Sequence, residues 1–334
     1  MNLKELSKEL NLSISTVSKA LRDRPEISTA TKKKVLKKAK EFNYQANPFA
    51  SNLRNQKSKT IAVIIPAIAN NFFSSAINGA ESYAQGKGYH VLIYQTHEDV
   101  KKEMAVAKHL LNGRVDGIMI SLTRATTKTK HLEDLKNSGI PLVFFDRVPE
   151  KMDSPKITTD DYNSAFAGTQ HLIKNGCKRI AFLSISNTLS IINNRMKGYL
   201  DALKKHDILV DEKLIVYCGD DKKENKNFIK KILSKSNRAD GIFASVEELA
   251  ITSYEICEEL NFTIPTDVKI ISYSNLQTAA ILNPSLTSIT QPAYEIGREA
   301  ASILFKLVDK KEIGAKEANT VLKSSLIVRD STKG

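Results

Sequence analysis

Two kinds of hydrophobic pattern divide the chain. In the first 43 residues, apolar positions recur every three or four residues, as in the stripe formed by Leu3, Leu6 and Leu10. Beyond residue 58, short continuous apolar runs such as Ile61–Ile65 alternate with longer stretches of helical spacing. The first pattern predicts amphipathic helices, and the second predicts buried parallel strands that alternate with covering helices. We therefore expect a small helical domain followed by a larger α/β part.

The first segment carries the signals for three short helices. Asn2 has Glu5 three residues after it, which is the spacing of a capping box. Ser13 is expected to cap a second helix, and Ser28 a third helix from about Thr29 to Phe42. The expected inward residues of these two helices are Val17, Ala20, Leu21, Ala30, Val35, Ala39 and Phe42. Two short helices joined by a tight turn are typical of a helix-turn-helix, whose second helix enters the major groove of DNA.

The second helix is expected to turn short or flexible side chains outward near its start, where a recognition helix meets base edges. The candidate DNA contacts are Ser13, Ile14, Ser15, Thr16, Ser18 and Lys19. An outward Ile14 suits contact with the methyl group of thymine. A three-helix bundle that binds no DNA is the alternative for this segment.

The charge of the chain is concentrated at this end. The full sequence of 334 residues has a net charge of +13, and residues 1–58 hold 13 of the 50 basic residues but only five of the 37 acidic ones. A strongly basic, small domain fits a polyanionic partner. Residues 44–58 are mostly polar, and Pro48 can begin a short helix there, but a helix of about six residues needs a partner to be stable.

Three motifs in this region resemble the LacI/GalR family of bacterial transcription regulators: the run Leu12–Leu21 (LSISTVSKAL), Asn43-Tyr44, and Ala50-x-x-Leu53. The likeness extends to about residue 330. It implies that the tether becomes a hinge helix on DNA, with contacts from Asn47, Ala50 and Leu53, the last wedged into the central base step through the minor groove. The chain departs from the family at Lys19, where arginine is usual, and in the position of Pro48.

The resemblance also implies a two-lobed α/β core like that of periplasmic binding proteins, between whose lobes the chain crosses three times. We expect a headpiece at 1–43, a hinge at 44–58 and a core at 59–334. The first lobe is placed at about 59–158 and 289–316, and the second at about 159–288 and 317–330. Besides Ile61–Ile65, strands are expected near residues 89–94, 117–120, 142–145, 180–183, 214–217, 242–244 and 268–271.

Ligands of open parallel sheets bind beyond the carboxyl ends of the strands. That rule marks residues 66–73, 121–123, 146–147, 245–247, 273–275 and the segment before Arg195. The resemblance assigns effector contacts to Phe72, Phe73, Ser121, Asp146 and Arg195, and places Ser274 and Asn275 in the same site. Alternatively, the two phenylalanines belong to the core and Asp146 only pairs with Arg147. The family often has aspartate where this chain has Ser274, so neutral hydrogen bonds are expected there.

An arginine fork with a carboxylate suits vicinal hydroxyls, and aromatic faces suit sugar rings, so the expected effector is a sugar or sugar derivative. The predicted function is a cytoplasmic repressor that binds a near-palindromic operator as a homodimer under control of this effector. Release of DNA and promotion of DNA binding by the effector are both compatible with this arrangement. No membrane partner is expected, because no apolar stretch approaches the length that spans a bilayer.

Two other functions would fit parts of this pattern. A solute-binding protein would use the same core, but the chain shows no signal sequence and carries a DNA headpiece. An enzyme is disfavoured, because Pro66–Asn71 after the first strand lacks the glycines of a dinucleotide-binding turn. The six histidines do not fall at metal-ligand spacing, and the three cysteines fit neither a zinc site nor a disulfide framework. No catalytic residue, metal or cofactor is therefore expected.

Overall fold

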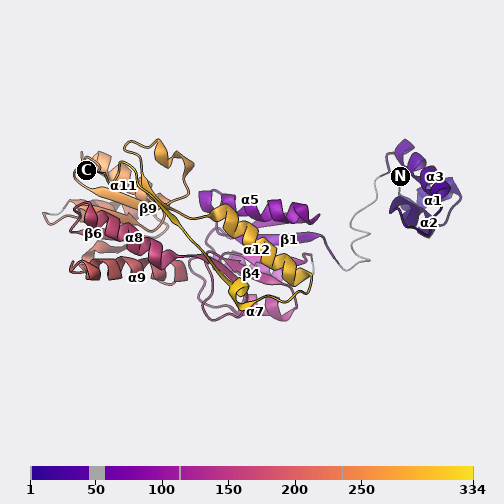
Figure 1. The fold of residues 1–334 in the computed structure, drawn as a ribbon, viewed down its shortest axis with the longest axis horizontal. Coiled ribbons are helices and arrows are strands. Elements are labelled where there is room, and N and C mark those ends of the chain that lie inside the picture. Colours follow the sequence, from indigo (N-terminus) through magenta and orange to yellow (C-terminus); the bar gives the residue numbers. More distant parts are fainter. Residues whose placement is uncertain (1, 45–56, 113, 235, 334) are drawn as a thin grey trace. The chain divides into compact units, whose positions relative to one another are not determined.

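The computed structural model describes residues 2–44, 57–112, 114–234 and 236–333, and it divides into two compact units, residues 1–58 and 59–334. Each unit is described by itself (Figure 1). In the described parts of the chain, no helix is long and apolar enough to cross a membrane.

The small unit is a three-helix domain made of α1 (Leu3–Leu10), α2 (Ile14–Leu21) and α3 (Thr29–Glu41). The predicted caps are confirmed, with a capping box at Asn2 and side-chain caps from Ser13 and Ser28. Its core consists of Leu6, Leu10, Val17, Ala20, Val35 and Ala39. The prediction that Ala30 and Phe42 point inward was wrong. Both are exposed, and the Lys38 ammonium lies 4.7 Å from the centre of the Phe42 ring.

The first lobe of the large unit is built on a parallel sheet with the strand order β11-β5-β4-β3-β1-β2. These strands are β1 (Thr60–Ile65), β2 (His90–Gln95), β3 (Gly117–Ile120), β4 (Leu142–Phe145), β5 (Lys156–Thr159) and β11 (Asn319–Leu322). The helices of this lobe are α5 (Asn71–Gly86), α6 (Val100–Leu110), α7 (Lys130–Asn137), α12 (Ala293–Val308) and the short α13 (Ala315–Ala318). Helices α5 and α12 lie side by side on one face, and α6 and α7 cover the other (Figure 1).

The second lobe has the strand order β12-β10-β9-β8-β6-β7, in which only β12 runs antiparallel to its neighbour. These strands are β6 (Ile180–Ser184), β7 (Ile215–Tyr217), β8 (Gly241–Ala244), β9 (Lys269–Tyr273), β10 (Thr287–Thr290) and β12 (Ser325–Ile327). The covering helices are α8 (Asp161–Lys174), α9 (Ser190–Lys205), α10 (Lys222–Leu233) and α11 (Glu247–Glu259). Short 3-10 turns follow at Glu212–Leu214 and Gln277–Ala280.

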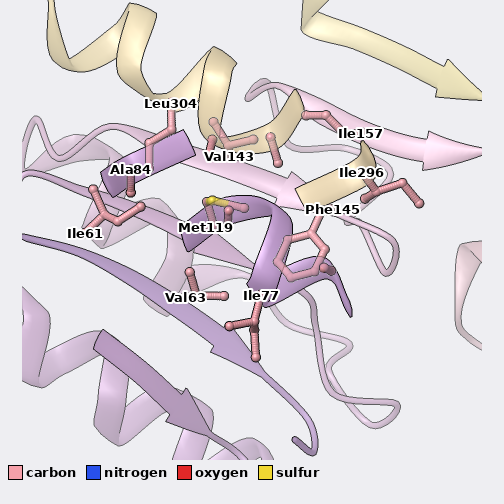
Figure 2. Close-up of a cluster of buried hydrophobic side chains, with 14 of the residues drawn as sticks. Ile61, Val63, Ile77, Ala84, Met119, Val143, Phe145, Ile157, Ile296 and Leu304 are labelled. Carbon is pink, nitrogen blue, oxygen red and sulfur yellow. The ribbon is translucent and has the colours of Figure 1, made fainter. Parts of the chain in front are cut away.

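Apolar side chains from the strands fill the space between each sheet and its helices. Figure 2 shows this packing in the first lobe, where Ile61 and Val63 of β1, Met119 of β3 and Val143 of β4 meet residues of α5 and α12. Because both faces of the sheet are covered at its centre, β1, β3 and β4 are apolar at nearly every position, as the continuous runs in the sequence predicted.

The lobe boundaries differ from the prediction in two places. Residues 319–322, expected in the second lobe, form β11 and pair with β5 in the first. Thr287–Thr290 was predicted to lie partly in the first lobe but forms β10 of the second sheet. The chain therefore returns to the first lobe at Gln291, not at residue 289. Both strands have four residues, of which β10 holds one apolar residue and β11 two, so their apolar content did not reveal which sheet would accept them.

Candidate DNA-binding and ligand-binding sites

The exposed face of α2 is the candidate DNA-reading surface. Ser13 accepts a hydrogen bond from the Thr16 amide at 3.0 Å, which satisfies a free amide of the first turn. Ile14 is 46% exposed, and Ser15 beside it is exposed as well. An apolar group next to a hydroxyl at the start of a helix can contact a thymine methyl and a polar base-edge atom.

The other candidates on α2 have neighbours within the unit. The Arg22 guanidinium donates to the Ser18 hydroxyl at 2.9 Å, and the Lys19 ammonium lies 3.3 Å from the Glu26 carboxylate. The Thr16 hydroxyl is 2.8 Å from that of Ser13. Surface contacts of this kind stabilise weakly, so DNA can displace them. The predicted hinge contacts lie outside the described residues: Asn47, Ala50 and Leu53.

A small cavity lies between the two lobes of the core. Its volume is about 40 Å³, far below the roughly 300–1,000 Å³ of pockets that hold small-molecule ligands. The walls come from the starts of α5 and α11, from α9, and from the segments that follow β9 and β10. The lining residues are Asn70, Phe72, Arg195, Val246, Glu247, Tyr273, Ser274, Asn275 and Gln291.

Arg195 is fixed in the wall of this cavity with one donor group free. Its Nε donates to Asp161 Oδ1 at 2.7 Å, and its Nη1 donates to the carbonyl of Ser245 at 2.7 Å. The guanidinium stacks over the Tyr273 ring, 3.6 Å from the ring centre. The third nitrogen, Nη2, is buried and has no hydrogen-bond partner among the described residues. It is therefore available to a ligand oxygen.

Two further unpaired atoms lie in or beside the same wall. Within the described ranges, the Ser245 hydroxyl and Asn275 Oδ1 are buried without a hydrogen bond, whereas the Asn275 amide donates to the Gln291 carbonyl at 2.7 Å. Buried polar atoms are normally paired, because an unpaired one carries the full cost of its desolvation. Three such atoms at one interlobe cavity are what a polar ligand requires.

Two buried carboxyl groups lie close to Arg195. Burial raises the pKa of Asp161 to about 6; the positive charge of Arg195 opposes this rise, and the negative charge of Asp146 adds to it. Burial likewise raises the pKa of Asp146, against the opposing charges of Arg147 and Arg195. The Gln291 amide lies 3.5 Å from Asp146 Oδ1 and 3.1 Å from the Thr159 hydroxyl, so it ties the first lobe to the crossing after β10.

Polar contacts hold the lobes together around the cavity. Glu247 of the second lobe accepts from the Asn71 amide of the first lobe at 2.9 Å, and from the Ser274 hydroxyl at 2.9 Å. Three other contacts join the lobes: Arg124 to Asp220 at 3.0 Å, Thr188 to the Arg124 carbonyl at 3.1 Å, and Ser190 to the Val148 carbonyl at 3.2 Å. The lobes are therefore closed around this cavity, and a ligand larger than a water molecule or two fits it only when the lobes separate.

Both parts of the chain match families of known proteins. Residues 2–47 match the family described as bacterial regulatory proteins, lacI family. Residues 58–329, most of the chain, match periplasmic binding proteins and the sugar-binding domain of the LacI family. The chain belongs to the LacI family. It has the DNA-binding headpiece and the two-lobed α/β core of these transcription regulators.

The LacI-family relatives match over almost the whole chain. The transcriptional regulator RegA of Clostridium saccharobutylicum is 28% identical over 99% of both chains. Catabolite control protein A of Priestia megaterium is 30% identical over 92% of this chain and 93% of its own length. The structure of the lac repressor dimer bound to operator and an anti-inducer shares the fold, with a TM-score of 0.86 at 20% identity and coverage of 100% and 99%. These relatives are regulators, not enzymes.

The candidate effector residues fall into two groups in this LacI-family core. The first group lines the cavity: Phe72, Arg195, Ser274 and Asn275. Asp146 does not line it, but its Oδ1 lies 3.5 Å from the side-chain amide of Gln291, which does.

Phe73 and Ser121 do not line it. Successive residues of a helix point about 100° apart, so Phe73 packs into the core, with its ring 6.4 Å from that of Phe145. Ser121 is fully buried near the Arg147 amide, at 3.4 Å.

The sequence did not single out five residues of the cavity as ligand contacts: Asn70, Val246, Glu247, Tyr273 and Gln291. The first four lie in segments that the strand-end rule had marked, residues 66–73, 245–247 and 273–275. Gln291 was not predicted to be near the cleft, because β10, the strand that ends just before it, was not recognised in the sequence.

Proposed function

We propose that this LacI-family regulator represses transcription by binding a near-palindromic operator as a homodimer, and that a small carbohydrate in the cleft controls its affinity for DNA. The observation that carries the ligand-binding part is the group of unpaired polar atoms at the interlobe cavity, on Arg195, Ser245 and Asn275. Because its partner is chromosomal DNA, we place the protein in the cytoplasm.

Operator recognition is assigned to the outer face of α2, together with the hinge residues Asn47, Ala50 and Leu53. The contacts on α2 are Ser13, Ile14, Ser15, Thr16, Ser18 and Lys19. The exposure of Ile14 and Ser15 supports direct base contact, and the basic charge of residues 1–58 supports binding to phosphates. A transport protein with the same core is not favoured, since residues 2–47 match a family of regulators.

A homodimer is supported by exposed apolar side chains on the edge strand β2 and on the helix that follows it. Leu92 and Ile93 are each 42% exposed, Met104 is 49% exposed and Leu111 is 39% exposed. A free sheet edge with apolar neighbours is a typical place for a second subunit. Two-fold symmetry of the protein matches two half-sites on the operator.

We infer that ligand control works through a change in the separation of the two lobes. The ligand contacts we propose come from both lobes: Phe72, Asp146, Arg195, Ser274 and Asn275, with Phe73 and Ser121 in the layer behind. A ligand held between the lobes stabilises the closed core, and it changes DNA affinity only by the difference in its affinity for the two states.

The DNA part is tested by selecting operator sequences from a random library with the full chain. We expect a near-palindromic consensus, and exchange of Ile14 and Ser15 should change the preferred base at symmetric positions. As a control, exchange of the exposed Lys33 should weaken binding to all sequences alike. An unchanged consensus after exchange of Ile14 and Ser15 would contradict base readout by α2.

A further inference from the structure

Glu247 connects the two lobes at the cavity, since it accepts hydrogen bonds from Asn71 and Ser274, each at 2.9 Å. We propose that Glu247 is a specificity-determining residue of the cleft. Its carboxylate accepts a hydrogen bond from an uncharged, hydroxyl-bearing ligand and excludes anionic ligands such as sugar acids and sugar phosphates. This inference rests on the ligand-binding function proposed above and specifies the charge of the ligand.

The backbone places this carboxylate at the cavity. Strands β8 and β9 are parallel neighbours, with Ala244 paired to Ser272, so the segments after them leave the sheet side by side. Glu247 is the first residue of α11, where the free amides of the first turn favour negative charge. The side chain thus reaches Ser274 within its own lobe and Asn71 across the cleft.

Glu247 supplies the acceptor that position 274 lacks. Where the family often has aspartate, the Ser274 hydroxyl donates to Glu247 and accepts from the Leu276 amide at 3.0 Å. A carboxylate has about four acceptor positions, and the contacts described here occupy one on each oxygen. The others can accept hydrogen bonds from ligand hydroxyls.

The charges of the cavity wall disfavour an anion. Arg195 is the only cation among the described residues that line the cavity, and it is paired with Asp161 at 2.7 Å. The nearby Arg147 is paired with Glu98 at 2.7 Å. Glu247 therefore adds a carboxylate to a wall whose positive charge is already matched, and a ligand anion would be repelled.

The unpaired atoms favour hydroxyl groups for a second, independent reason. Arg195 Nη2 is a donor, Asn275 Oδ1 and Glu247 are acceptors, and the Ser245 hydroxyl can be either. A ligand hydroxyl donates as well as accepts, so a polyol can satisfy both kinds of atom. A carboxylate or a dianionic phosphate group only accepts, so beside these atoms it would leave Asn275 Oδ1 unpaired and would give Glu247 no further hydrogen bond.

The experiment measures the affinity of the full chain for matched pairs of probes by calorimetry. The pairs are D-glucose and D-gluconate, D-galactose and D-galacturonate, D-ribose and ribose 5-phosphate, and cellobiose and cellobionate. We expect a neutral member to bind at least about ten-fold more tightly than its acid or phosphate. Glu247→Gln should weaken binding of the neutral member by about 10- to 100-fold, the usual range for loss of a charge-assisted hydrogen bond. It should also reduce the ratio of the affinity for the neutral member to the affinity for the anionic member.

Glu248→Gln is the matched control, because Glu248 is the next residue of α11 and is exposed; it should leave the ratio unchanged. The double variant Glu247→Gln with Ser274→Asp returns a carboxylate to the cavity and should restore the preference for the neutral member. Three results would overturn the proposal. They are an anionic member that binds as tightly as its neutral partner, an affinity ratio that Glu247→Gln does not change, and a panel in which no neutral member binds. Operator binding by the same protein shows whether the proposed regulator function survives that result.

Discussion

The ion pair between Arg195 and Asp161 lies within the core, with side chains 2% and 1% exposed. Removing one partner of a buried pair leaves an uncompensated charge, which typically costs about 3–5 kcal/mol. Arg195→Ala should therefore lower the free energy of unfolding of the core by about that amount, in addition to any loss of ligand binding. Urea unfolding followed by circular dichroism measures this cost.

A matched control is Arg179→Ala, which breaks the 2.8 Å pair with Asp211 at side-chain exposures of 28% and 31%. Exposed pairs contribute less than about 1 kcal/mol, so this variant should stay close to the original chain. Equal losses for the two variants would mean that burial does not set the cost at Arg195. The stability measurement also shows whether Arg195→Ala loses ligand binding because a contact is removed or because the core unfolds.

Single residues of the cleft could be predicted only where a motif or a strand end marked them. Arg195 and Ser274 were found in this way and line the cavity. The role of Glu247 could not be predicted, because its contact with Asn71 joins the two lobes through residues 176 positions apart in the chain. Phe73 packs in the core and does not line the cavity, and the sequence did not reveal which face of α5 would meet the sheet.

Helices α5 and α12 approach each other through two glycines. A Cβ atom on Gly297 would lie 1.8 Å from the Ala76 carbonyl oxygen, and one on Gly79 would lie 2.0 Å from the Tyr294 carbonyl oxygen. Neither backbone can yield without separating the helices. Gly297→Ala should therefore destabilise the core by about 1–3 kcal/mol, the usual cost of overpacking, as measured by thermal unfolding.

Gly86→Ala provides the comparison, because Gly86 ends α5 and a Cβ atom there meets nothing within 4 Å. Alanine restricts the unfolded chain more than glycine, so this variant should be as stable as the original or more stable, by up to about 1 kcal/mol. A tolerated Gly297→Ala would show that α5 and α12 can separate, and would contradict the rigid packing inferred here.

His171 contacts the C-terminal segment of the core. His171 in the last turn of α8 lies 2.8 Å from the Thr332 hydroxyl, which is buried beside that of Thr287 at 2.7 Å. Burial lowers the pKa of His171 below its ordinary value of 6.5. Below pH 6.5 the unfolded chain therefore binds a proton that the folded chain resists, and stability falls as the pH drops.

His171→Gln removes this titration while keeping a hydrogen-bonding side chain. The difference in melting temperature between the original chain and this variant should become smaller by roughly 1–2 °C as the pH falls from 7.5 to 5.5. Thermal unfolding at several pH values provides the measurement. A difference that stays constant or grows would contradict the lowered pKa.

The elements that the sequence predicted well were those with long, regular patterns. The central strands β1, β3, β4, β6 and β8 are continuous apolar runs, and each was located. The strands β5, β10, β11 and β12 were missed, since each contains serine or threonine and none is a continuous apolar run. The sheet to which each of these strands belongs depends on backbone pairing with strands that are distant in the sequence, and a local hydrophobic pattern does not show this pairing.

At the scale of the whole molecule, the sequence divides where its hydrophobic period changes. The structure divides between Ser58 and Lys59, and each unit has a hydrophobic core of its own. The three chain crossings could be anticipated only from the family resemblance, because the composition near Thr159, Gln291 and Leu322 does not change as it does at a domain linker.

Because each unit has its own core, the large unit should not need the headpiece in order to fold. We expect residues 59–334 alone to melt within about 2 °C of the core transition of the full chain, since no part of their cores is removed. Specific operator binding should be lost. Calorimetry and sedimentation of both proteins test this, and the fragment should remain a dimer if β2 and α6 form the interface. A fragment that unfolds, or that becomes monomeric while the full chain stays dimeric, would mean that residues 1–58 contribute to the stability or to the assembly of the core.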